Sequence, residues 1–109
     1  MINNMRFNTA LLHSAAPGDK ATGATLTPIY QSSAFYQESA LQHEKLFANK
    51  APGFSYTRIG NPTIVAFEDR ITVLEGGMAS VACESGMAAV TCAFLNITQE
   101  GDEIVVRTG

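Results

Sequence analysis

The most regular alternation of apolar and polar residues in the chain follows Asn61. Asn61 is a favourable helix N-cap, and Pro62 is a favourable first helical residue. Apolar side chains then recur at spacings of three, four and three residues, which places them on one helical face. They are Ile64, Phe67, Ile71 and Leu74. The Gly76-Gly77 pair ends the pattern, so the sequence predicts an amphipathic helix between Pro62 and Gly76.

After this helix the pattern changes to continuous apolar segments. Residues 78–83 predict a buried parallel strand, and residues 103–107 predict a second one. Between them, residues 87–97 are apolar nearly all round, which is typical of a helix enclosed by other elements. Strand, helix and strand in this order form a right-handed βαβ unit, so the predicted fold class is α/β. Two strands cannot cover both faces of such a sheet, and we expect the chain to be the first part of a larger fold.

The first half of the chain has a different pattern. Residues 5–15 predict a short helix, and residues 38–50 predict a moderately amphipathic one. Residues 21–36 are rich in Thr, Ser and aromatic residues and include a proline, which predicts an extended segment on a surface. We therefore expect an N-terminal arm over 1–60 and the start of an α/β domain over 61–109.

Composition excludes several classes of function. Of the 109 residues, 46% are hydrophobic and 16% are charged, which excludes a disordered tail. The net charge of −3 and the pI near 5.2 argue against binding to nucleic acid or to an anionic membrane. The longest apolar stretch, over 87–95, is shorter than the ~20 residues that a membrane span needs. The N-terminal residues show no signal-peptide pattern.

The cysteines and histidines predict neither a disulfide framework nor a metal site. Cys83 and Cys92 lie in apolar segments, which predicts two buried thiols in a cytoplasmic protein. His13 and His43 are far apart and lack metal-type spacing with the cysteines, so we expect no metal ligand among them.

One candidate anion site lies where the first predicted strand turns into a helix at Ser85-Gly86. The first N–H groups of that helix carry a positive partial charge, and Gly86 lets a ligand approach the backbone closely. These features suit a phosphate. The alternative is a purely structural turn, because many α/β proteins join a strand to a helix through Ser-Gly without a ligand.

A second candidate is the loop ahead of Asn61, which contains Tyr56 and Arg58. The arginine offers a fork of N–H donors and the tyrosine a hydroxyl, a combination that suits phosphate or carboxylate. The alternative is a surface arginine paired with one of the ten acidic residues.

Five motifs, in this order, resemble the Cys/Met-metabolism family of pyridoxal-phosphate enzymes. They are TPIYQSSAF at 27–35, SYTRIGNPT at 55–63, LEGG at 74–77, SGMAA at 85–89 and GDEIV at 101–105. Within the family, the segment FANKAPGFSYTRIGNPT is most similar to the O-acetylhomoserine sulfhydrylases. Methionine γ-lyases, cystathionine γ-synthases and cystathionine γ-lyases are the alternatives.

The resemblance implies the type I pyridoxal-phosphate-dependent transferase fold, of which this chain would be the N-terminal arm and the first βαβ part. The backbone N–H groups of Gly86 and Met87 would hold the phosphate of pyridoxal 5′-phosphate. Tyr56 and Arg58 would reach the phosphate in the neighbouring subunit, which makes residues 1–60 an inter-subunit segment. The implied assembly is a homodimer with shared active sites, with tetramers common. The implied reaction replaces acetate on a small amino-acid substrate by sulfide or a thiol.

The lysines depart from the family pattern. Lys20, Lys45 and Lys50 all lie in the arm, so no Schiff-base lysine is present and no catalytic residue is assigned. We expect the 109 residues alone to be inert. A non-catalytic phosphate-binding dimerisation module and a small α/β domain without a ligand are the alternatives from other classes.

Overall fold

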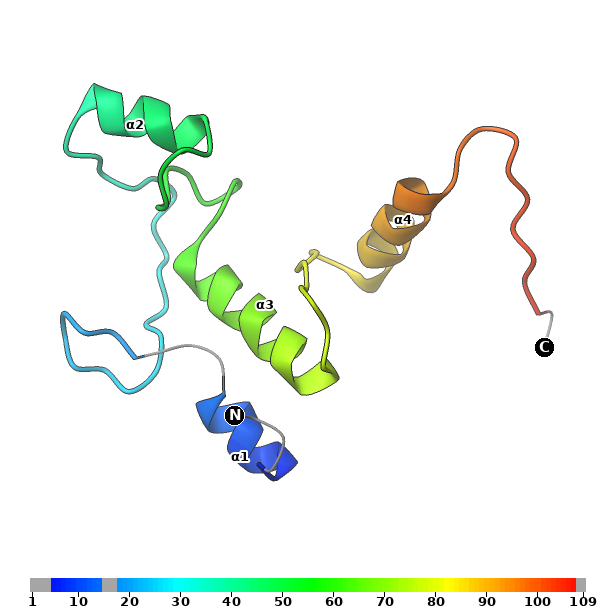
Figure 1. Cartoon of the computed structure of the whole chain (residues 1–109), viewed down its shortest axis with the longest axis horizontal. Helices are drawn as coiled ribbons and strands as arrows, with labels where there is room; N and C mark the ends of the chain where they lie inside the picture. The colour runs from blue at the N-terminus through cyan, green and yellow to red at the C-terminus, as the bar shows by residue number, and fades with distance from the viewer. Residues whose placement is uncertain (1–4, 15–17, 108–109) are drawn as a thin grey trace.

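The structure is a computed structural model that describes residues 5–14 and 18–107. Its helices, in chain order, are α1 (Phe7–His13), α2 (Ala40–Phe47), α3 (Pro62–Glu75) and α4 (Gly86–Ile97). Helix α1 packs against α3, while α4 stands apart from both (Figure 1). The radius of gyration is 17.9 Å, whereas a compact domain of 100 residues has about 13 Å. The described chain is therefore open.

Helix α3 forms where the apolar spacing predicts it. Asn61 Oδ1 accepts a hydrogen bond from the Thr63 N–H at 2.8 Å and caps the helix. Gly76 has a φ of +63°, a conformation that favours glycine. The Gly77 N–H then donates to the Thr72 carbonyl at 2.9 Å, which satisfies one of the last free carbonyls. Both predicted ends of the helix are confirmed.

The other three predicted helices are also confirmed. Helix α1 lies within the predicted range 5–15, whose last residue is outside the described residues, and α2 lies within 38–50. Helix α4 covers the predicted range 87–97 and begins one residue earlier. The hydroxyl of Ser39 caps α2 by accepting from the Gln42 N–H at 3.2 Å. Local signals are therefore sufficient to locate each helix in the part of the chain that the structure describes.

Residues 27–36, a segment of the predicted arm, lie against the start of α3 without regular secondary structure. The Tyr30 N–H donates to Thr63 Oγ1 at 2.8 Å, and Thr63 Oγ1 donates to the Pro28 carbonyl at 3.4 Å. Further along, an isolated antiparallel bridge pairs Ala34 with Tyr56. Polar contacts therefore attach the arm to the loop and helix that follow it. Most residues of the predicted surface segment are exposed, as expected.

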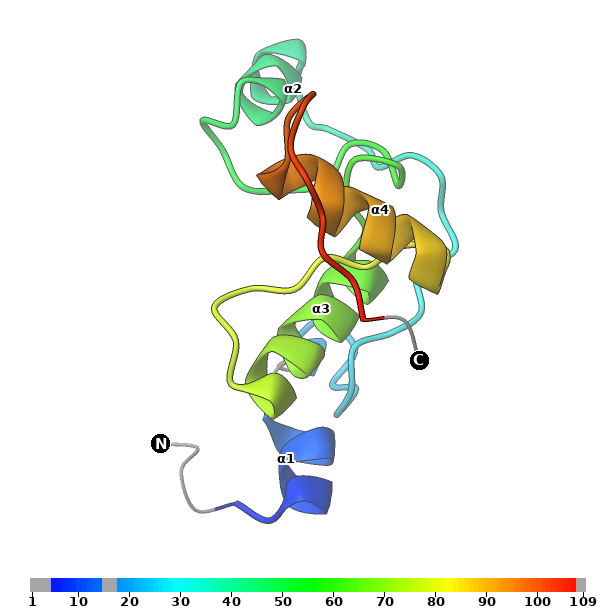
Figure 2. The same cartoon turned by 90° about the vertical axis from the view of Figure 1, so that its right-hand side faces the viewer.

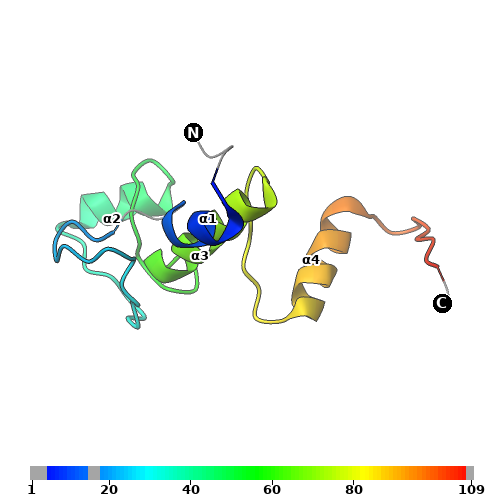
Figure 3. The ribbon, with the colours of Figure 1, turned by 90° about the horizontal axis from the view of Figure 1, so that it is seen from below.

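The two predicted strands, 78–83 and 103–107, are not formed. In the part of the chain that the structure describes, β-pairing is limited to isolated bridges within residues 19–56. Figures 1 and 3 show the two segments on opposite sides of α4, so they do not pair. A strand exists through hydrogen bonds to a neighbour, and a lone pair of strands with both faces in water is marginal. The predicted βαβ unit is therefore not confirmed in the described residues, although its helix is present.

Apolar side chains of the second half are uncovered. Ala10 of α1 is the one buried hydrophobic residue among those described. Figure 2 shows α4 followed by an extended C-terminal segment that forms no sheet. The large apolar residues exposed on these two elements are Met87, Val90, Phe94, Leu95, Ile97, Ile104, Val105 and Val106.

Cys92 is exposed and Cys83 half-buried, so the prediction of two buried thiols is wrong here because their surroundings are open. No helix in the described ranges is long and apolar enough to cross a membrane.

Candidate phosphate-binding site

The N-terminus of α4 presents backbone N–H groups to solvent. Ser85 is extended, and its Oγ accepts from the Ala88 N–H at 3.1 Å. This cap does not use the N–H groups of Gly86 and Met87, and the first turn of a helix offers them no carbonyl. Both residues are exposed, and a Cβ on Gly86 would meet nothing within 4 Å. The backbone is therefore open to an anion, which the helix dipole favours.

Residues 55–60 form a tight loop that presents Tyr56 and Arg58. The Tyr56 carbonyl accepts hydrogen bonds from the Ile59 and Gly60 N–H groups at 2.9 and 3.1 Å. Arg58 Cζ lies 5.2 Å from the centroid of the Tyr56 ring, which is a cation–π contact. Both side chains are exposed, so the guanidinium edge faces solvent where it can meet a phosphate.

The same loop forms one wall of a hollow against α2. Its volume is about 450 Å³, and four of its eight lining residues carry an aromatic ring. Besides Tyr56 and Arg58, the lining residues are Ala34, Phe35, His43, Phe47, Ser55 and Ile59. The rings of His43 and Phe47 lie 4.9 Å apart by their centroids. An exposed arginine at the edge of an aromatic hollow suits an anion attached to a ring.

The structure brings the four predicted site residues together as two pairs. Tyr56 contacts Arg58, and Gly86 directly precedes Met87. Figures 1 and 3 both show the loop before α3 well apart from the start of α4. Within one chain the two pairs do not meet, and the expected sharing between subunits stays a prediction.

The sequence predicts only a capping role for Asn61, but its side chain also binds residue Tyr30 of the arm and Thr57 of the loop. Asn61 is 3% exposed. Its Nδ2 donates to the Tyr30 carbonyl and to Thr57 Oγ1, both at 3.0 Å. The contact with Tyr30 spans 31 residues of sequence, so no local pattern could have revealed it.

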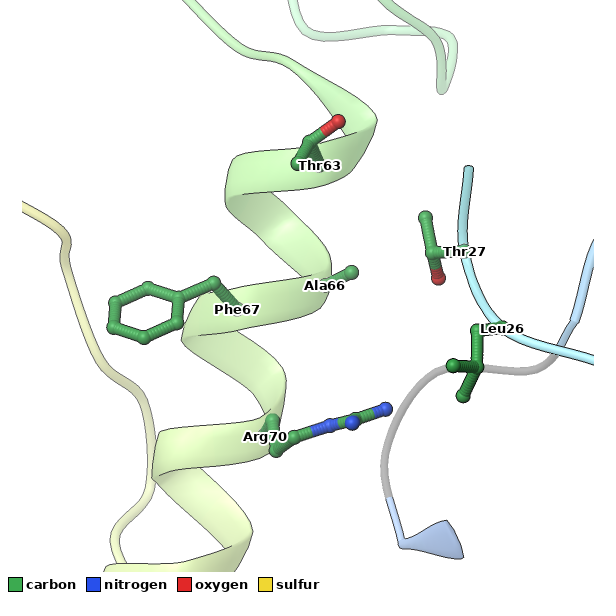
Figure 4. A pocket seen from close by; sticks show the side chains of 6 residues that line it. All are labelled: Leu26, Thr27, Thr63, Ala66, Phe67 and Arg70. Carbon is green, nitrogen blue, oxygen red and sulfur yellow. The ribbon is translucent and has the colours of Figure 1, made fainter. Parts of the chain in front are cut away.

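A cavity between α3 and the arm was also missed. Its volume is about 260 Å³, and it is lined by Leu26, Thr27, Thr63, Ala66, Phe67 and Arg70 (Figure 4). The Arg70 side chain extends from α3 toward Leu26, and its buried Nε has no hydrogen-bond partner among the described residues. The four α3 residues are spaced three, one and three apart, which is one helical face, and that spacing could have identified them.

Cys83 lies just ahead of the α4 N-terminus. Desolvation raises the pKa of its thiol, and the nearby Cys92 and Glu84 raise it further. A thiol with a raised pKa is a poor nucleophile at neutral pH.

In residues 5–14 and 18–107, no group of three or more His, Cys, Asp or Glu is placed to hold a metal ion.

Comparisons with known proteins agree with the family resemblance. The family model described as "Cys/Met metabolism PLP-dependent enzyme" matches residues 8–109. The chain is 46% identical over 99 residues to O-acetyl-L-homoserine sulfhydrylase of Corynebacterium glutamicum, which covers 91% of this chain and 23% of that protein. It is 38% identical over 104 residues to L-methionine gamma-lyase of Treponema denticola, an alignment that covers 95% of this chain and 26% of that protein. The chain therefore belongs to the Cys/Met-metabolism family, whose cofactor is pyridoxal phosphate.

A solved structure extends the agreement to the backbone. A putative O-acetylhomoserine (thiol)-lyase from Campylobacter jejuni subsp. jejuni superposes with a TM-score of 0.80 at 33% identity, which covers 91% of this chain and 24% of that one. That structure contains N′-pyridoxyl-lysine-5′-monophosphate. The chain spans about a quarter of the length of the relatives that it matches.

Proposed function

We propose that this chain supplies the phosphate-binding segment of a pyridoxal-phosphate enzyme that replaces acetate on O-acetylhomoserine by sulfide or a thiol. The observation that carries this proposal is the open N-terminus of α4, where Ser85 caps the helix without using the Gly86 and Met87 N–H groups. The 46% identity to an O-acetyl-L-homoserine sulfhydrylase favours that reaction within the family. The 38% identity to an L-methionine gamma-lyase makes γ-elimination the second candidate.

In this proposal the four site residues hold the cofactor's phosphate from two subunits. Gly86 and Met87 donate backbone N–H groups at the α4 N-terminus. Tyr56 and Arg58 of a second copy add a hydroxyl and a guanidinium. The exposure of both pairs, and their separation within one chain, support this arrangement. It makes residues 1–60 an inter-subunit arm, residues 61–109 the start of the cofactor domain, and the assembly a homodimer or a pair of dimers.

The chemistry itself belongs to the cofactor, whose ring withdraws electrons from the carbon atoms of a bound amino acid. The residues of this chain bind and orient the phosphate end of that group. The lysines of the given sequence, Lys20, Lys45 and Lys50, all precede the predicted cofactor domain. We therefore propose that the 109 residues alone are inert. The free thiols Cys83 and Cys92 favour a reducing compartment, and we place the protein in the cytoplasm.

The test uses the intact gene product, purified with pyridoxal phosphate. It should form homocysteine from O-acetylhomoserine and sulfide, while the 109-residue chain assayed beside it forms none. Release of methanethiol from methionine as the main activity would favour the second candidate. Failure of the intact product to bind pyridoxal phosphate would contradict both.

A further inference from the structure

We propose that Asn61 is a positioning residue that holds the loop of Tyr56 and Arg58 in place for the cofactor's phosphate. This inference rests on the proposed function, because it concerns the same site. It adds that the orientation of Arg58 depends on a buried amide that does not itself touch the phosphate.

The Asn61 side chain makes more hydrogen bonds than capping requires. Its Oδ1 accepts from the Thr63 N–H at 2.8 Å, which is the capping bond. Its Nδ2 donates to the Tyr30 carbonyl and to Thr57 Oγ1, both at 3.0 Å. At 3% exposure, this side chain is one of the most buried polar groups described. A primary amide has two N–H donors, and both are used here.

The other capped helices show what a cap alone needs. Ser39 caps α2 and Ser85 caps α4, each with a single hydroxyl oxygen. Serine and asparagine are about equally good N-caps. Capping of α3 therefore accounts for the Oδ1 atom of Asn61 but not for its Nδ2 group, which makes two further hydrogen bonds.

Thr57 connects that donor to the site, because it lies between Tyr56 and Arg58 in sequence. Its Oγ1 accepts from Asn61 Nδ2 and donates to the Ser32 carbonyl. The hydroxyl thus links the loop to α3 on one side and to the arm on the other. Tyr56 and Arg58 are exposed, so their own side chains contribute little to fixing the loop. The Thr57 hydroxyl therefore fixes the loop together with the backbone hydrogen bonds of the Ala34–Tyr56 bridge and of the Tyr56 carbonyl.

The experiment measures binding of pyridoxine 5′-phosphate and of pyridoxine to the intact gene product by calorimetry. Neither ligand has the aldehyde, so the ratio of the two dissociation constants reports the phosphate contacts alone. Asn61→Ser keeps a capping oxygen and removes both Nδ2 bonds. Thr57→Val removes the hydroxyl at nearly constant volume, and Thr57→Ser restores it. Ser39→Ala, which removes a helix cap without removing any hydrogen bond of Asn61 or Thr57, is the matched control.

Asn61→Ser and Thr57→Val should each lower the preference for the phosphate ester about tenfold, because a charge-assisted hydrogen bond is lost or misdirected. Thr57→Ser and Ser39→Ala should keep the parental preference. If Asn61→Ser does not fold, the two Thr57 variants decide the question.

Two results would overturn the inference in different ways. If Arg58→Ala removes the preference but Asn61→Ser and Thr57→Val keep it, the proposed phosphate site stands and the positioning role is wrong. If the parent protein binds both ligands equally, the proposed function is wrong and the inference is wrong with it.

Discussion

Residues 27–63 and residues 78–107 both lack a strand, but they are held in different ways. The first region is bound by side-chain hydrogen bonds that cross long stretches of sequence, centred on Asn61 and Thr63. In the second, Ser80 and Ala82 bond to side chains of α3 at 2.9 and 2.8 Å. Beyond Ala82, the described residues form only local hydrogen bonds. A polar network can order a segment without a core, whereas an apolar segment needs a surface to cover it.

The two regions also carry different halves of the candidate site. The arm-side region presents a charged side chain, Arg58, on a loop that polar bonds hold. The second region presents backbone N–H groups on a helix whose apolar face is uncovered. Substitutions in the arm-side region should therefore change phosphate binding through the charge of Arg58. Substitutions at the start of α4 should change it through access to the backbone N–H groups.

The largest effect is expected at the α4 N-terminus. Gly86→Val should weaken binding of pyridoxine 5′-phosphate by about a hundredfold, because its side chain would cover N–H groups that hydrogen-bond a charged ligand. A Cβ at Gly86 meets nothing within 4 Å, so thermal stability should change little. Gly77→Ala, whose Cβ would make ordinary contacts, is the control. Equal affinity in the Gly86→Val and Gly77→Ala proteins, measured by calorimetry, would contradict the prediction.

The next effect is expected on the arm side. Arg58→Ala should weaken binding of the phosphate ester by about tenfold to a hundredfold, and Arg58→Lys should recover part of the loss, because lysine keeps the charge without the fork. Binding of pyridoxine should not change. Raising the salt concentration should reduce the difference between parent and Arg58→Ala, because the site is exposed. A salt-independent difference would indicate a packing effect of the arginine.

The free energy of unfolding should distinguish the two N-cap residues Asn61 and Ser39, which the sequence alone does not distinguish. Asn61→Ala should lower the free energy of unfolding by about 2 kcal/mol or more, because it removes the cap and also the two part-buried Nδ2 hydrogen bonds. Ser39→Ala should cost about 1 kcal/mol or less, because only a cap is lost. Denaturant unfolding of the intact gene product gives both values. Equal losses would mean that the Nδ2 bonds of Asn61 contribute nothing.

The smallest effect concerns two thiols, that of Cys83 just before α4 and that of Cys92 within α4. Because burial raises the pKa of Cys83, its thiolate fraction is low at neutral pH and grows only as the pH rises toward that pKa. In the 109-residue chain, Cys83 should therefore react with iodoacetamide more slowly than the exposed Cys92, and the gap should narrow as the pH rises. Mass spectrometry of the alkylated peptides gives both rates. Faster alkylation of Cys83 at pH 7 would contradict this.

The same difference between regions decides what the sequence could reveal. The helices were predictable because their signals are local: Asn61 and Pro62 begin α3, and Gly76 ends it. The sequence also predicted strands at 78–83 and 103–107, and these do not form. A strand depends on hydrogen-bonding partners that no local pattern supplies. The burial of Cys92 was misjudged for a similar reason, since apolar composition shows which surface needs cover but not whether it has any.

The placement of the candidate site residues was predictable to the same degree. Gly86 and Met87 follow from the position of a helix start, and the Tyr56–Arg58 contact lies within three residues. The second role of Asn61 depends on the Tyr30 carbonyl, 31 residues away in sequence, and became visible only in the fold.

The most direct test of the account is to mix two defective copies of the intact gene product, one with Arg58→Ala and one with Gly86→Val. If Arg58 serves the α4 N-terminus of the partner, half of the randomly mixed dimers contain both copies, and one of the two sites in each is free of substitutions. About a quarter of the parental capacity for pyridoxine 5′-phosphate should then return. If both groups serve the same chain's site, every site carries a defect and mixing should restore no binding, which would contradict the shared site.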